Sequence, residues 1–225
     1  MGKIDKNKPL PEHTKVRYEE CVALIFLEHY FSNRYGDFSI RDKPDLYSEK
    51  EDIGIEVVEA VDPKKKEAEK MWYTIPYLTD VEKEKHIKRM NELGFPFMSE
   101  GVQGWPGQQY DKGINSDPYV WLFSALEKKL ELIKSGKYME CKEYELFIEG
   151  EMRPIRECQH QLMEKLSSII KKMDVKLSRV YLLTQAVLQV FDFASEDCCW
   201  IDTSDLYNKL VCEACRRVEE TEEQT

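Results

Sequence analysis

Two acidic residues, Asp45 and Glu56, stand in the segment "KPDLYSEKEDIGIEVVEA" at residues 43–60. Glu56 interrupts an apolar, β-branched run that is typical of a strand, and the polar turn "SEKED" before it predicts a β-hairpin. The hairpin brings Asp45 alongside Glu56. Two neighbouring carboxylates repel each other unless a cation lies between them, and their hard oxygens suit Mg²⁺ or Mn²⁺. The alternative is a solvated hairpin whose acids face water.

A lysine far along the chain provides the second chemical signal. When "WLFSALEKKLELI" is placed on a helical wheel at about 100° per residue, Lys129 falls near the centre of the apolar arc and Lys128 at its edge. An inward lysine is costly unless it reaches water or meets a carboxylate, so we expect Asp45 and Glu56 to be its partners. Snorkelling at a loosely packed helix face is the alternative. The arc comprises Trp121, Leu122, Ala125, Leu126, Leu132 and Ile133.

The motif as a whole resembles the PD-(D/E)xK superfamily of restriction-endonuclease-like nucleases. The resemblance rests on "PD", a ten-residue spacer and the Glu of "IEVV". It implies an αβββαβ core in which Asp45 and Glu56 bind Mg²⁺, with the backbone carbonyl of Val57 completing the metal shell. The family places a lysine two positions after the Glu, where this chain has Val58. In some members the lysine lies on a neighbouring helix, and Lys129 fits that arrangement.

Some members of the superfamily add a glutamate from the first helix. On a wheel of residues 15–32, Glu19 lies on the flank of the apolar face, whereas Glu20 points away from it. Glu19 is therefore the additional acid that the resemblance suggests for the site.

The activity that the resemblance implies is Mg²⁺- or Mn²⁺-dependent hydrolysis of phosphodiesters in nucleic acid, with DNA as the expected substrate. Asp45, Glu56 and Lys129 are the expected catalytic residues. The alternative is a nuclease-like scaffold that has lost catalysis and binds or regulates a partner. Val58 at the lysine position and the net charge of −10 favour this alternative. A zinc or redox protein built on clustered cysteines is a third class; these are Cys198, Cys199, Cys212 and Cys215.

The order of predicted elements gives an α/β fold with helices on both sides of one mixed sheet. A helix at 15–32 precedes the hairpin, and Asp62 with Pro63 begins a second helix. The pattern then predicts a helix at 80–93 and a long Gly- and Pro-rich loop at 93–118. A helix capped by Asp117, a strand, a helix at 153–173, three short strands and a last helix from about Ser204 to Val218 complete the chain.

The 225 residues suit a single domain, residues 1–225, with a helical and loop insertion at about 74–116 and a short acidic tail at 219–225. No apolar run approaches the roughly 18 residues that a membrane span needs, so no membrane partner is expected. Seven scattered cysteines without a secretory signal indicate reduced thiols and the cytoplasm. Assembly as a homodimer is left open.

Overall fold

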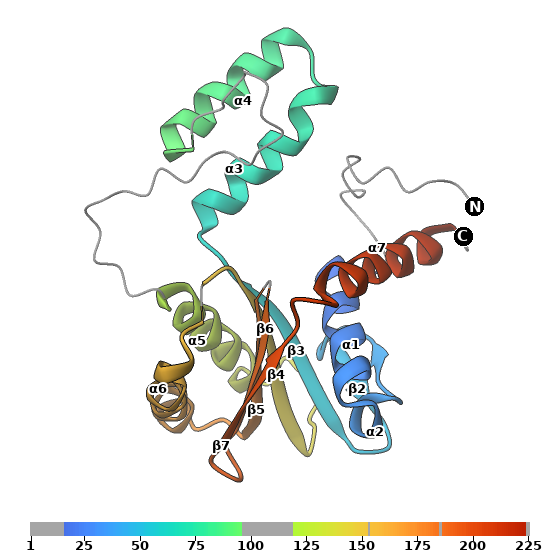
Figure 1. Ribbon diagram of the computed structural model, residues 1–225, viewed down its shortest axis with the longest axis vertical. Helices are drawn as coiled ribbons and strands as arrows, with labels where there is room; N and C mark the ends of the chain where they lie inside the picture. The colour runs from blue at the N-terminus through green and yellow to red at the C-terminus, as the bar shows by residue number, and fades with distance from the viewer. Residues whose placement is uncertain (1–15, 96–118, 153, 185, 224–225) are drawn as a thin grey trace. The chain divides into compact units, whose positions relative to one another are not determined.

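The structure is a computed structural model that describes residues 16–95, 119–152, 154–184 and 186–223 (Figure 1). The chain divides into two compact units. The larger unit comprises Thr14–Ala60 and Pro118–Thr225, and the smaller one Met1–His13 and Val61–Asp117. No helix in the described ranges has both the length and the apolar character that crossing a membrane requires.

The larger unit is built on a seven-stranded sheet in which the strands lie in chain order. The two central pairings, β3 with β4 and β4 with β5, are parallel, and the four outer pairings are antiparallel. Parallel neighbours need a crossover, and helices α5 and α6 supply the two crossovers. The strands are β1 (Ser39–Ile40), β2 (Leu46–Ser48), β3 (Ile53–Ala60), β4 (Glu143–Gly150), β5 (Leu177–Leu183), β6 (Val187–Asp192) and β7 (Asp197–Asp202).

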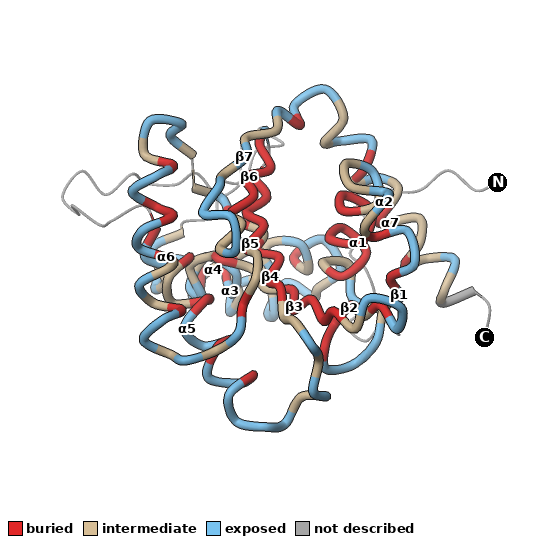
Figure 2. The backbone as a smooth tube through the Cα atoms, turned by 90° about the horizontal axis from the view of Figure 1, so that it is seen from below, coloured by how far each residue is buried: buried red, intermediate tan, exposed pale blue. Residues whose placement is uncertain are grey.

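Helices cover both faces of this sheet and make the unit a three-layer α/β structure (Figures 1 and 2). On one face lie α5 (Val120–Lys134) and α6 (Gln159–Met173), preceded by the short η2 (Arg156–Cys158). On the other lie α1 (Tyr18–Tyr30), α2 (Ser32–Tyr35) and α7 (Tyr207–Glu223). The α/β class with a mixed sheet, expected from the order of elements, is confirmed.

One apolar core lies between the sheet and the α5–α6 layer. Leu122 and Leu126 of α5 and Leu146 and Val180 of the central strands are fully buried there. The parallel strands are buried on both faces, as the red segments of β3, β4 and β5 in Figure 2 show. A charged side chain that emerges from one of these strands is therefore surrounded by protein.

The smaller unit contains α3 (Pro63–Thr74), η1 (Ile75–Tyr77) and α4 (Asp80–Leu93). Asp62 caps α3 by accepting a hydrogen bond from the backbone N–H of Lys64, as its position before Pro63 predicts. Thr79 and Glu82 form a capping box at the start of α4. Ala68, Ile75 and Met90 form a small buried core between these elements.

Several predicted boundaries differ from those observed. The expected helix at 15–32 ends at Tyr30 because Phe31 adopts non-helical backbone angles, after which α2 forms a single turn. The hairpin gains a third short strand, β1. The last helix begins at Tyr207 and continues through Glu223, into the acidic segment that we expected beyond it. Asp117 and the loop residues 96–118 lie outside the described residues.

Candidate active site

The antiparallel pairing of β2 with β3 positions the two acids. Leu46 pairs with Ile55, so Asp45, one residue before β2, stands opposite Glu56. Pro44 lies against Gly54 of β3, where a Cβ atom would come within 2.7 Å of the proline Cγ. Glycine at this position therefore allows the close approach of the "KPD" segment to β3.

The ammonium group of Lys129 joins both carboxylates from α5. Its Nζ lies 2.6 Å from Glu56 Oε2 and 3.4 Å from Asp45 Oδ2. Both acids are buried, Glu56 completely. The expectation that an inward lysine on this helix meets Asp45 and Glu56 is confirmed as geometry. The apolar arc differs from the one that we expected, because Leu130 is buried while Trp121 and Leu132 are exposed at its flank.

Further donors surround the carboxylate of Asp45. The backbone N–H of Val57 donates to Asp45 Oδ2 at 2.8 Å, and Arg17 Nη2 lies 2.5 Å from Asp45 Oδ1. By contrast, Oε1 of Glu56 is buried and has no hydrogen-bond partner among the described residues. A buried carboxylate oxygen without a donor is costly, which makes it an acceptor available to a cation.

The surroundings of Glu56 shift the pKa of its carboxyl group in both directions. Burial raises the pKa of its carboxyl group, and the charge of Asp45 raises it further, whereas Lys129 and the hydroxyl of Tyr138 lower it. The net effect is a pKa above the ordinary value for glutamate. Burial and the charge of Glu56 in turn raise the pKa of Tyr138, which keeps this phenol protonated as a hydrogen-bond donor. The site therefore attracts positive charge.

A cavity of about 630 Å³ opens over these residues, with Asp45, Lys129 and Tyr138 among the groups that line it. Arg17, Arg41 and Lys43 also line it and have exposed side chains. Among the lining acids, Asp45 and Glu20 are buried and Asp42 is exposed beside the cations, while Glu56 is not a lining residue. This arrangement suits a ligand that carries phosphate groups.

The first helix contributes a different acid from the one expected. Glu20 is buried, lines the cavity and accepts hydrogen bonds from Arg17, whereas Glu19 is half-buried and is not among the cavity's lining residues as described. The prediction that Glu20 points away was wrong. Every residue of α1 from Glu20 through Leu27 is buried. A helical wheel, which assumes one buried and one exposed face, therefore cannot predict which way Glu20 points. One sequence feature could have located Glu20: it stands three residues after the N-cap Arg17, where a glutamate can form a capping box.

Two other predicted residues have mainly backbone or packing roles. Val57 is buried and donates its N–H to Asp45. Val58, at the family's lysine position, is partly buried and packs into the apolar cluster beneath α5 and α6. This side chain lies on the same face of β3 as Glu56, which is the face that Lys129 approaches.

No group of three or more His, Cys, Asp or Glu side chains within the described residues is arranged to hold a metal ion. Cys198, Cys199, Cys212 and Cys215 are thus not gathered into such a group, and none of the seven cysteines, all of which lie within the described residues, forms a disulfide. The paired acids differ from a dedicated metal cage because Lys129 and Arg17 already balance their charge.

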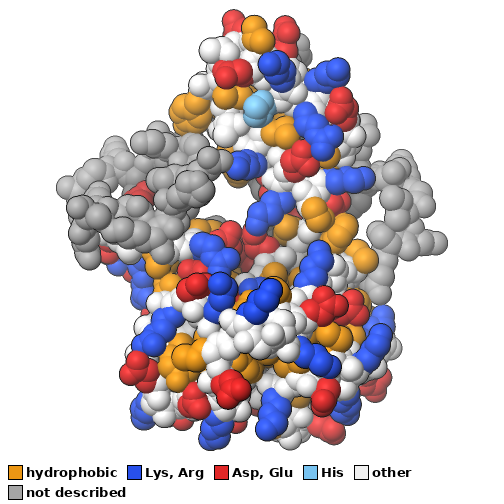
Figure 3. Space-filling model, turned by 180° about the vertical axis from the view of Figure 1, so that it is seen from behind, with side chains coloured by type: hydrophobic (Ala, Val, Ile, Leu, Met, Phe, Trp, Pro, Cys, Tyr) orange, Lys and Arg blue, Asp and Glu red, His pale blue; other side chains and the backbone are white. Residues whose placement is uncertain are grey.

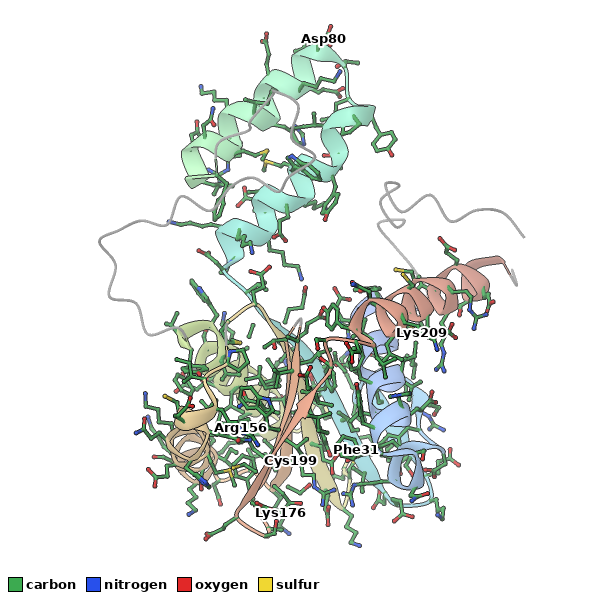
Figure 4. All side chains as sticks on the ribbon, in the orientation of Figure 1. Phe31, Asp80, Arg156, Lys176, Cys199 and Lys209 are labelled. Carbon is green, nitrogen blue, oxygen red and sulfur yellow. The ribbon has the colours of Figure 1, made fainter. Side chains whose placement is uncertain are left out.

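Sequence reasoning missed a second polar cluster, on the opposite face of the sheet. Glu145 of β4 is fully buried and accepts hydrogen bonds of 2.7 Å from both Arg34 and Tyr35. The Tyr35 hydroxyl also contacts that of Tyr181. A cavity of about 260 Å³ lies beside the cluster, and Figure 4 labels two of its lining residues, Phe31 and Cys199. Alternation along "EYELFIEG" places Glu145 on the same face as Glu143 and Glu149, which favours an exposed position, and nothing in the sequence identifies its partners.

Comparison with family models, with curated proteins and with solved structures gave no match.

Proposed function

We propose that the site hydrolyses phosphodiester bonds of nucleic acid, with DNA as the first candidate substrate, in the presence of Mg²⁺ or Mn²⁺. The observation that carries the proposal is the position of Lys129, whose Nζ contacts two buried carboxylates from adjacent strand segments. A buried lysine needs only one acid to form a structural ion pair. Two acids that share one lysine under an open, cation-lined cavity suit a reaction centre better than a structural ion pair.

The order of elements supports a restriction-endonuclease-like core. A helix, a three-strand meander, a crossover helix and a parallel strand follow one another as α1, β1–β3, α5 and β4. This succession is the αβββαβ order that the resemblance implies. The smaller unit, with α3 and α4, is inserted between β3 and α5.

The donor set has the chemistry that a hard divalent cation requires. Asp45 and Glu56 supply carboxylate oxygens, and Glu56 Oε1 is a buried acceptor without a donor among the described residues. We assign the cation to these two residues, with the Val57 carbonyl as a further ligand. A bound divalent cation polarises the phosphate and lowers the pKa of a bound water.

The chain's own groups perform the remaining tasks. Lys129 lies where it can orient the attacking water and stabilise negative charge that develops on the phosphorus oxygens. Arg17, Arg41 and Lys43 line the same cavity and offer contacts to the phosphates that flank the scissile bond. The hydrogen bond from the Tyr138 hydroxyl lowers the pKa of the Glu56 carboxyl group and so favours its ionised form.

The charge distribution favours a local contact with nucleic acid. The whole chain has a net charge of −10, and the face shown in Figure 3 mixes Lys and Arg with Asp and Glu. Such a surface exerts little long-range attraction on a polyanion. Substrate binding then depends on the cations of the cavity itself, and we expect it to be strongly weakened by salt.

A catalytically inactive scaffold is the competing proposal. It is favoured by Val58 in place of the family's lysine and by Arg17, which neutralises Asp45. On this proposal Lys129 and Arg17 are permanent counter-charges of a structural cluster. The cytoplasmic location and a homodimer remain predictions of the sequence under either proposal.

The test is a cleavage assay on linear, circular and single-stranded DNA and on RNA, with Mg²⁺, Mn²⁺ or EDTA. Wild type is compared with Glu56→Ala and Lys129→Ala, and Lys128→Ala serves as the matched control because Lys128 is exposed on the same helix. We expect metal-dependent cleavage that both site variants lose and the control retains. Cleavage that survives Glu56→Ala would refute the assignment. A folded wild type that cleaves none of the substrates would favour the scaffold.

A further inference from the structure

Arg17, one residue before α1, holds an unusual position at the mouth of the cavity. Its Nη2 atom lies 2.5 Å from Asp45 Oδ1 and 2.6 Å from Glu20 Oε1. The two acids are buried, but 58% of the Arg17 side chain is exposed. A solvent-facing cation therefore contacts an oxygen of a residue that we assign to the metal.

The other donors to Asp45 are less able to leave. The Val57 N–H belongs to the backbone of β3, and Lys129 is only 14% exposed and is also bound to Glu56. A cation that binds Asp45 comes close to the positive charges of Arg17 and Lys129, which repel it. Arg17 is the most solvent-exposed of these donors and can exchange its contact with Asp45 for water, so we take it to be the donor that leaves most readily.

We propose that Arg17 is a phosphate-binding residue that rests on Asp45 until a divalent cation takes its place. This inference rests on the proposed function of the site. The double charge of a divalent cation at Asp45 repels the guanidinium of Arg17. The released guanidinium then lies along the same cavity as Arg41 and Lys43. A guanidinium binds phosphate through two parallel hydrogen bonds, which a lysine cannot reproduce. Cation and phosphate binding are thereby coupled, since each favours the released state of Arg17.

The first experiment measures Mg²⁺ affinity by isothermal titration calorimetry. Arg17→Gln removes the competing charge while its amide can still donate to Glu20. Arg41→Gln is the matched control: Arg41 lines the same cavity but pairs with the exposed Glu49. We expect Arg17→Gln to bind Mg²⁺ about tenfold more tightly than wild type, within the usual range of coupling between sites. Arg41→Gln should change the affinity far less, and Glu56→Gln should abolish binding.

The second experiment measures the coupling directly, by fluorescence anisotropy of a labelled six-residue oligothymidylate. Binding is compared in EDTA and in Ca²⁺, which uses the same oxygen ligands, and a gel checks that the oligonucleotide stays intact. In wild type we expect Ca²⁺ to increase the affinity at least fivefold, the lower end of typical coupling. In Arg17→Gln the increase should be largely lost, and in Arg41→Gln it should persist.

The outcomes separate this inference from the function on which it rests. If Glu56→Gln abolishes Mg²⁺ binding but Arg17→Gln and Arg41→Gln behave alike, the role of Arg17 is wrong and the metal site stands. If wild type and every variant fail to bind Mg²⁺, both proposals fail. Tighter Mg²⁺ binding by Arg17→Gln together with lost coupling supports the inference.

Discussion

Replacing Lys129 by methionine tests whether the buried acids depend on this one ammonium group. The substitution keeps the length and apolar stem of the side chain and removes its charge. Glu56 is completely buried, and Lys129 Nζ lies 2.6 Å from its Oε2 atom. In wild type the pKa of Glu56 is already raised by burial and by Asp45, although Lys129 opposes the shift. Without the lysine, this pKa rises further.

The expected magnitude follows from the loss of a partner to a buried charge. Two unit charges about 4 Å apart attract each other by about 4 kcal/mol at an effective dielectric constant of about 20. Part of this attraction offsets the desolvation of the lysine. Removing one partner of a buried pair typically destabilises a protein by about 3–5 kcal/mol, and we expect a loss in this range at pH 8. Lys128→Met, at an exposed position on the same helix, should change stability by less than about 0.5 kcal/mol.

The loss should shrink in acid. A carboxyl group whose pKa is higher in the folded than in the unfolded state takes up protons on folding, so the free energy of unfolding falls as pH rises between those two pKa values. Below the unfolded value both states are protonated and the penalty disappears. In Lys129→Met the folded pKa is higher still, so the variant regains stability as the pH is lowered from 8 to 5.

Urea denaturation of both variants and wild type at pH 5 and pH 8 measures these differences through the midpoint and the slope. Adding Glu56→Gln to Lys129→Met should restore at least about 1 kcal/mol, because residues in contact are coupled by about 0.5–3 kcal/mol. Equal stability of Lys129→Met and Lys128→Met would refute the account of the buried pair. So would a loss that grows toward acid pH.

Three further substitutions test the scaffold that positions the site. Gly54→Val places a Cβ atom within 2.7 Å of Pro44 Cγ, so it should destabilise the protein by about 1–3 kcal/mol in urea and weaken Mg²⁺ binding in calorimetry; unchanged binding would mean that the "KPD" segment is not held by this contact. Tyr35→Phe removes the hydroxyl that donates to buried Glu145 and should cost about 1–3 kcal/mol in urea, more than Tyr47→Phe, whose hydroxyl donates to half-buried Asp52 in the turn before β3; equal costs would contradict the buried network. Leu126→Ala, on the buried face of α5, should lower the thermal midpoint in line with a loss of about 2–5 kcal/mol, whereas Leu132→Ala, 43% exposed, should change it little; similar shifts would contradict the orientation of α5.

The hairpin and the inward lysine were predictable because both depend on short-range periodicity. Alternation along β3 placed Glu56 on one face, and the turn returned the preceding segment alongside it. The spacing of apolar residues in α5 then fixed the direction of Lys129. Each of these inferences needs only neighbours in sequence, and the contact between Lys129 and Glu56 confirmed their combination.

The remaining parts of the site depend on packing that no local pattern contains. Glu20 was misplaced because α1 is buried on nearly all sides. Arg17 lies within the predicted helix at 15–32 but precedes the observed α1, and its contact with Asp45 spans 28 positions of the chain. The partners of Glu145 come from α2 and β5, so they are known only when the sheet order is known.

The most direct test of the central claim is to locate a metal ion in a crystal of the protein soaked with Mn²⁺. Mn²⁺ accepts the oxygen ligands that suit Mg²⁺, and its anomalous scattering identifies it independently of the fitted atoms. The account predicts one strong anomalous peak bound by the carboxylates of Asp45 and Glu56, with Arg17 displaced from Asp45 Oδ1. An anomalous map without a peak at these two carboxylates, from crystals in which both side chains are well ordered, would contradict it.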